Sequence, residues 1–284
     1  MKKMWKNVLS LLLALSLTVS ITGCGSQEAA PGTENTQTEG AESAEASASD
    51  GEKIINIGVT DSLGGVNPFV IDQTEINKYA VGLMFLPLME LDSELNFVGM
   101  LADSVTTEDN LNFTVHINDE AVWSDGTPVT AADVEFTVRR LASPVVNNTT
   151  LMLYAFEGIG DDGFVTAGAE SIDGIQIIDD KTVRFTSKNP MALTTFENTY
   201  ARYIHTLPKH IIEKFSEEEL LTTEWFNKPD VINGPFYLTD YDNNHYISYE
   251  ANADYWKGAP KIDKLNIKIV DASQVLAGLQ SGEI

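Results

Sequence analysis

Residues 123–134 read Trp-Ser-Asp-Gly-Thr-Pro-Val-Thr-Ala-Ala-Asp-Val, and this stretch carries the clearest structural information in the chain. Its Asp-Gly pair is typical of a turn, because glycine adopts left-handed backbone angles without steric cost. Thr130 followed three residues later by Asp133 forms a capping box, in which each side chain accepts a hydrogen bond from the other residue's backbone N–H. The pattern predicts a helix over residues 131–141 that ends before Pro144.

The segments on either side of this helix show both strand and helix patterns. Apolar residues at every second position predict strands at 55–59, 111–117, 175–177, 183–185, 236–241, 245–249 and 265–269. Helical spacing predicts a helix at 76–83, a helix after Ser216, and a last helix that starts at Asp271 or Ser273 and ends at Gly282. Strands and helices that are interspersed without strict alternation indicate mixed α/β layers.

Composition excludes several classes of function. The chain has 284 residues with 18 Lys+Arg against 42 Asp+Glu, a formal net charge of −24, which argues against binding to nucleic acid or to an anionic membrane surface. One Cys permits neither an intrachain disulfide nor a multi-Cys zinc site. His205 and His210 are five residues apart and do not share a helix face, and no nucleophile motif or phosphate-binding glycine loop is present. We therefore predict a binding protein with no catalytic residue, no metal site and no cofactor.

The N-terminus has the pattern of an export signal. Three lysines precede an uncharged apolar stretch at 8–21, whose length as a helix is roughly 21 Å and so too short for the ~30 Å bilayer core. Small residues directly before Cys24 resemble a bacterial lipobox, so we predict a signal peptide at 1–23 and acylation of Cys24. Residues 24–52 are acidic and lack aromatic residues, which predicts a disordered tether.

Three stretches, taken in order, resemble one family. They are residues 123–134, then Asn-Gly-Pro-Phe-Tyr at 233–237 with Asn-x-x-Tyr-Trp-Lys-Gly at 252–258, and finally Ser-Gly-Glu-Ile at 281–284. Together they resemble the family 5 solute-binding proteins, the oligopeptide, dipeptide and nickel receptors of ABC importers. Since the first stretch consists of a turn and a helix cap, we interpret these motifs as scaffold and not as a binding site.

The resemblance implies an α/β fold of the periplasmic-binding-protein type (class II, peptide-binding), built as a mixed-sheet lobe with a small inserted α+β domain. We expect the first lobe at 53–84 and 209–284 and the inserted domain at 85–208. Family members are much longer than this chain, so we expect an N-terminal portion in which the second lobe is missing. A lone lobe leaves its ligand-facing surface open to water, and tight capture is not expected from it.

The resemblance also implies three places where a ligand contacts this lobe: the first loop, the segment after Pro144, and the segment before Leu207. The residues are Asp72, Gln73, Thr74, Thr150, Tyr200 and Arg202. For Arg202 two alternatives stay open, a carboxylate-binding role and a solvated surface position. For Tyr200 and Tyr154, packing in the core is the favoured alternative.

The function implied by the resemblance is that of a substrate-binding lipoprotein of an ABC importer, most simply for oligopeptides or dipeptides. It would be exported, held at the membrane by its lipid anchor alone, monomeric, and partnered by permease and ATPase subunits, with no catalytic step of its own. A lipid-anchored peptide-signal sensor or a surface interaction lipoprotein is the alternative. Adjacent permease and ATPase genes would favour import over sensing.

Overall fold

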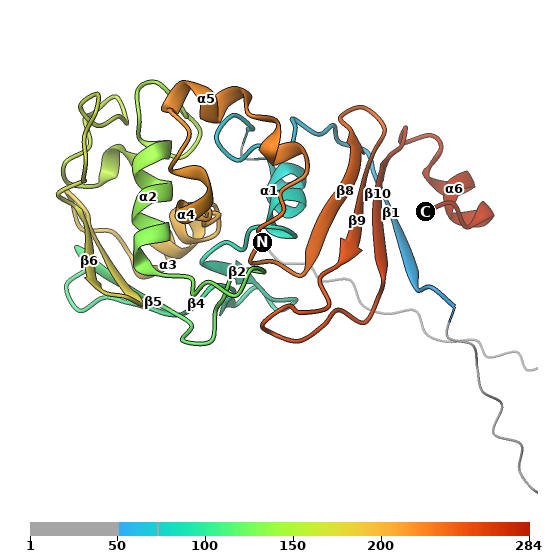
Figure 1. The fold of residues 1–284 in the computed structure, drawn as a ribbon, viewed down its shortest axis with the longest axis horizontal. Coiled ribbons are helices and arrows are strands. Elements are labelled where there is room, and N and C mark those ends of the chain that lie inside the picture. Colours follow the sequence, from blue (N-terminus) through green and yellow to red (C-terminus); the bar gives the residue numbers. More distant parts are fainter. Residues whose placement is uncertain (1–50, 73) are drawn as a thin grey trace, which may run out of the picture. The chain divides into compact units, whose positions relative to one another are not determined.

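A computed structural model describes residues 51–72 and 74–284 (Figure 1). The predicted signal peptide, Cys24, most of the predicted tether and Gln73 lie outside the described residues. Within the described part of the chain, no helix is long and apolar enough to cross a membrane. Three sheets are present in it, and Figure 1 shows the two larger ones on either side of helices α1, α4 and α5.

The first four-stranded sheet has the order β1-β10-β9-β8, where β1 is Ile54–Val59, β10 is Lys264–Ile269, β9 is Tyr246–Ala251 and β8 is Phe236–Asp242. β1 runs parallel to β10, and the other pairs are antiparallel. Alternation along β9 and β10 buries Ile247, Tyr249, Leu265 and Ile267 on one face. The Tyr249 hydroxyl donates to the Ala80 carbonyl oxygen at 2.8 Å, which ties this face to helix α1 (Glu75–Gly82).

The second four-stranded sheet has the order β4-β5-β7-β6, where β4 is Ala102–Thr106, β5 is Asn112–Ile117, β7 is Thr182–Thr186 and β6 is Ile175–Asp179. All of its pairs are antiparallel, and the predicted hairpin of β6 and β7 is confirmed. Phe113, Val115 and Ile117 of β5 are fully buried on the predicted face. The short strands β2 (Met89–Leu91) and β3 (Phe97–Gly99) form a third sheet that the alternation pattern did not reveal.

Helix α2 (Ala131–Leu141) has the predicted bounds and the predicted cap. The Thr130 backbone N–H donates to Asp133 Oδ2 at 2.8 Å, so the carboxylate satisfies a donor that the helix itself cannot. Val134, Val138 and Leu141 form the buried stripe and pack toward β6 and β7. The local sequence pattern therefore specifies this helix completely.

The other helical segments are shorter and lie mainly in the second half of the chain. They are η1 (Leu153–Ala155), α3 (Leu193–Phe196), the π-helical turn η2 (Glu197–Ala201), α4 (Lys209–Ile212), α5 (Glu217–Thr222), η3 (Glu224–Asn227) and α6 (Val275–Ser281). The predicted cap of α5 at Ser216 and Glu219 is confirmed.

The predicted start of the last helix is wrong. Helix α6 begins after Gln274, because the Asp271 carboxylate is used in its own turn, where it accepts from the Ser273 backbone N–H at 2.8 Å. Its predicted end is confirmed, since Gly282 has the left-handed φ of 73° that terminates a helix.

The Asn-Gly-Pro stretch at 233–235 is a packing element, as expected. The Leu86 backbone N–H donates to the Asn233 side-chain oxygen at 2.8 Å, and Trp256 Nε1 donates to the Asn233 carbonyl oxygen at 3.1 Å. A Cβ atom on Gly234 would overlap with the backbone at Leu83. Glycine is required here because two backbone segments approach each other closely.

Candidate ligand-binding site

Two loops enclose a cavity of about 360 Å³ near the carboxyl-terminal side of α2. The first loop contributes Phe69–Asp72, the second contributes Val145–Thr150, and Leu221 of α5 also lines the cavity. The volume lies at the lower end of the range typical of small-ligand pockets. Its lining combines apolar side chains with amide, hydroxyl and carboxylate groups.

Two buried or half-buried asparagines hold the first loop in place. The Asn67 side chain accepts from the Phe69 backbone N–H at 3.0 Å and donates to the Leu220 carbonyl oxygen at 2.8 Å. Asn77 of α1, which is 2% exposed, donates to the Asp72 carbonyl oxygen at 3.0 Å and accepts from the Gly64 N–H at 2.8 Å. Side-chain amides therefore bond to backbone groups of the loop that have no partner in a helix or sheet.

Asn148 organises the second loop and joins it to the first. Its buried side-chain oxygen accepts from the backbone N–H groups of Thr150 and Leu151, both at 3.2 Å, and from the Thr150 hydroxyl at 3.0 Å. Its amide nitrogen lies 3.5 Å from the Phe69 carbonyl oxygen, at the limit of a hydrogen bond. Asn147 before it has a φ of 54°, which bends the chain into the turn.

The structure brings together two of the sequence-predicted ligand residues. Asp72 and Thr150 both line the cavity, one on each loop. Thr74 lies just beyond the first loop, where its hydroxyl accepts from the Asn77 backbone N–H at 3.3 Å and caps helix α1. Gln73 is outside the described residues.

Tyr200 is a buried residue that supports the segment after the second loop. It is 4% exposed, its hydroxyl donates to the Met152 carbonyl oxygen at 3.1 Å, and its ring packs edge-on against Phe156. Burial, with a smaller contribution from Tyr154, raises the pKa of Tyr200 to about 12. The core alternative is confirmed for Tyr200 and wrong for Tyr154, which is 47% exposed.

Arg202 belongs to a buried cluster of ion pairs. Its Nε donates to Glu90 Oε1 at 2.7 Å, and its guanidinium also lies 3.6 Å from a Glu75 carboxylate oxygen. The Lys78 ammonium, on a side chain that is 1% exposed, lies 2.9 Å from each of the same two carboxylates. The solvated alternative for Arg202 is therefore wrong, and its guanidinium is already paired with carboxylates of the chain itself.

Asn148 lies in the segment around Asn147 to Leu151 where the resemblance implied ligand contact, but neither its role in positioning the loops nor that of Asn77 was predicted. The consecutive Asn147 and Asn148 were a usable signal, because asparagine tolerates left-handed angles and its amide bonds to nearby backbone groups. Asn77 lacked such a signal, since it occupies an ordinary position within a helical pattern. Only the tertiary structure shows that its side chain faces the first loop.

The cavity and its surroundings can hold an extended molecule that has both polar and apolar groups. Val70 at the cavity is 52% exposed, and Met152, which follows the second loop, is 54% exposed. The described residues contain no group of three potential metal ligands. His205 bonds to the Phe85 carbonyl oxygen and His210 to Asp125, so the two rings have separate partners. The geometry supports binding through hydrogen bonds and apolar contacts.

Comparisons with known proteins agree with such a role. The family described as bacterial extracellular solute-binding proteins, family 5 (middle), matches residues 96–284. A putative ABC transporter peptide-binding protein of Brucella ovis is 32% identical over 203 residues, which cover 70% of this chain and 35% of that protein. The oligopeptide-binding protein OppA of Bacillus subtilis is 26% identical over 293 residues, which cover 100% of this chain and 49% of that protein.

Solved structures show the same fold. The crystal structure of Haemophilus influenzae OppA in complex with the peptide RPPGFSPFR has a TM-score of 0.68 and 26% identity, and the match covers 83% of this chain and 45% of that one. The substrate-binding protein CtaP of Listeria monocytogenes has a TM-score of 0.63 and 29% identity, and the match covers 82% of this chain and 44% of that one. The α/β fold class predicted from the sequence is thereby confirmed. The chain spans between about a third and half of the length of these relatives.

Proposed function

Because the chain belongs to the family 5 bacterial extracellular solute-binding proteins, we propose that it binds oligopeptides for an ABC importer and presents them to the permease. The family consists of solute-binding proteins and not of enzymes. The matching relatives from Brucella ovis and Bacillus subtilis are described as peptide-binding and oligopeptide-binding proteins. ATP hydrolysis would then belong to partner subunits.

The observation that carries this proposal is the two-loop cavity joined by Asn148. A peptide repeats the same N–H and C=O groups whatever its side chains, so hydroxyl, carboxylate and backbone groups on two opposed loops can hold it without reading its sequence. Asp72 and Thr150 supply such groups from opposite loops. Exposed apolar residues such as Val70 and Met152 offer contacts to varied side chains. Broad peptide specificity follows from this combination.

We expect Asn148→Ala to weaken peptide binding at least tenfold. Removing the amide leaves the backbone N–H groups of Thr150 and Leu151 without their acceptor and separates the two loops at Phe69. Each lost hydrogen bond of this kind costs about 1 kcal/mol, and tenfold corresponds to about 1.4 kcal/mol. The measurement is isothermal titration calorimetry of the whole chain with the peptide RPPGFSPFR.

Asn96→Ala is the matched control for this experiment. Asn96 is exposed, and among the described residues its side chain bonds only to Asp92, outside the cavity. Its replacement should leave the affinity unchanged. Equal peptide affinities of the Asn148→Ala variant and the unmodified chain would contradict the proposed site. No heat of binding with any of a panel of peptides would contradict the proposed ligand.

We also propose that the protein is exported and held at the outer face of the membrane through Cys24 as a monomer. Support comes from the sequence before Cys24 and from a family of extracellular proteins. Metabolic labelling with radioactive palmitate in a bacterial host should label the unmodified chain and not the Cys24→Ser variant. Label retained in the variant would rule out this anchor, because the chain has no other cysteine.

A further inference from the structure

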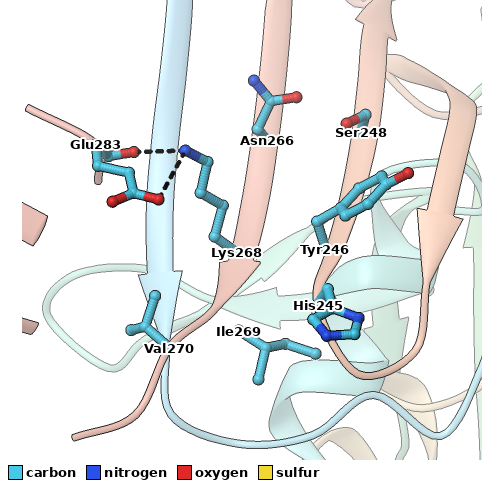
Figure 2. A pocket seen from close by; sticks show the side chains of 8 residues that line it. All are labelled: His245, Tyr246, Ser248, Asn266, Lys268, Ile269, Val270 and Glu283. Carbon is cyan, nitrogen blue, oxygen red and sulfur yellow. Dashed lines mark hydrogen bonds and ion pairs between the residues drawn. The ribbon is translucent and has the colours of Figure 1, made fainter. Parts of the chain in front are cut away.

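A second cavity, of about 500 Å³, lies on the sheet that contains β9 and β10 (Figure 2). Figure 2 shows polar side chains from both strands standing on the same face, with Glu283, which follows α6, opposite them. The lining residues are His245, Tyr246, Ser248, Asn266, Lys268, Ile269, Val270 and Glu283. None of them lines the two-loop cavity, so the two sites are separate.

The polar lining follows from the register of the two strands. Tyr246 pairs with Lys268, and Ser248 pairs with Asn266, so these four side chains form a compact patch on one face. The pair between them, Ile247 with Ile267, points to the other face and is buried. The sheet therefore has an apolar face in the core and a polar face at this cavity.

Lys268 and Glu283 place opposite charges side by side in the cavity. The Lys268 ammonium donates to the Glu283 backbone carbonyl oxygen at 2.9 Å, whereas the Glu283 carboxylate oxygen lies 3.8 Å away, beyond hydrogen-bond distance. The two side chains are 31% and 65% exposed. Exposed ion pairs contribute little to stability, so a ligand can separate this pair at little cost.

Other lining groups offer unused hydrogen-bonding capacity. The Ser248 hydroxyl has no partner among the described residues, and the Asn266 amide nitrogen donates to the Asn56 side-chain oxygen at 2.9 Å, which leaves the Asn266 oxygen available. The Tyr246 hydroxyl donates to Asp240 Oδ2 at 2.6 Å, and His245 Nδ1 lies 3.1 Å from Asp242 Oδ1. These carboxylates make the rim acidic, which disfavours a ligand that carries only negative charge.

We propose that this cavity binds a free α-amino acid in its zwitterionic form. The ligand's carboxylate lies on the Lys268 ammonium, its ammonium lies on the Glu283 carboxylate, and Ser248 and Asn266 hydrogen-bond to its polar side chain. A zwitterion inserts both of its charges between two opposite protein charges, and each charge gains a charge-assisted hydrogen bond. Compounds with only one of the two charges leave either Lys268 or Glu283 without a partner.

The test is calorimetric titration of the whole chain with L-serine, with acetate and ethanolamine as probes that carry a single charge. Serine should bind saturably and at least tenfold more tightly than either probe. Lys268→Met and Glu283→Gln should each weaken serine binding at least tenfold. Lys264→Met is the matched control, because Lys264 lies four residues before Lys268 on the same face of β10, pairs with Glu52 and does not line the cavity.

Three outcomes would overturn the proposal: no saturable binding of serine, equal binding of acetate or ethanolamine, or equal loss in the Lys264→Met control. Lys268 and Glu283 are exposed enough that thermal unfolding should show folded variants. Binding of RPPGFSPFR should be unchanged in the Lys268→Met variant, since that residue does not line the two-loop cavity. Failure of the amino-acid site and failure of the peptide site are thus distinguishable.

Discussion

Replacing Arg202 with Ala is expected to lower the free energy of unfolding by about 3–5 kcal/mol, the cost of breaking a buried ion pair by removing one partner. Arg202 and Lys78 together balance the carboxylates of Glu75 and Glu90. Without the guanidinium, the Glu90 carboxylate, only 14% exposed, keeps its negative charge and loses its closest partner. Urea unfolding at neutral pH, followed by tryptophan fluorescence, measures the effect.

Lys209→Ala is the control for this prediction, because Lys209 and Glu213 form an ion pair whose side chains are 39% and 49% exposed. The decrease in the free energy of unfolding caused by Lys209→Ala should stay within about 1 kcal/mol. The double variant Arg202→Met with Glu90→Gln should recover much of the stability, since it removes both charges. A stable Arg202→Ala protein with impaired peptide binding would instead show that Arg202 contacts the ligand.

The second large effect concerns the pH dependence of stability, which we assign to His205. The ring is fully buried and bonds to the Phe85 carbonyl oxygen, and burial lowers its pKa to about 4. The unfolded chain, with an ordinary pKa of about 6.5, therefore binds a proton that the folded chain excludes as the pH falls from 6.5 toward 4. This group's contribution to stability is complete above pH 6.5 and decreases by about 2 kcal/mol between pH 7 and pH 5.

His205→Gln isolates this contribution, because glutamine can still donate to the Phe85 carbonyl oxygen and does not titrate. The difference in unfolding free energy between pH 7 and pH 5 should be smaller by about 2 kcal/mol in this variant than in the unmodified chain. His245→Gln, at a side chain that is 72% exposed, is the control and should keep the original difference. An unchanged difference in the His205→Gln variant would show that other groups cause the acid sensitivity.

Much of the local structure was predictable from residues that are close in sequence. The capping box of α2, the alternation in β5 and the hairpin of β6 and β7 all depend on neighbours within a few positions. The strands β2 and β3 were missed because three residues are too few to show alternation. The start of α6 was wrong because Asp271 bonds within its own turn, an alternative that the same residue type also favours.

The site was predictable only in part. Asp72 and Thr150 were placed near a ligand by resemblance, and the structure shows them on facing loops. The division into a lobe at 53–84 and 209–284 and an inserted domain at 85–208 stays a prediction, as does any ligand contact by Gln73.

The sequence by itself determined the family, the caps of α2 and α5, most strands and the binding-protein class, because these depend on patterns within short windows and on motif order. The tertiary structure decided which residues far apart in sequence contact one another. Arg202 bonds to Glu90 across 112 residues, and Asn148 lies beside Phe69 across 79. No local pattern encodes such contacts, since they form only after separate segments pack and exclude water, and burial then requires each polar group to find a partner.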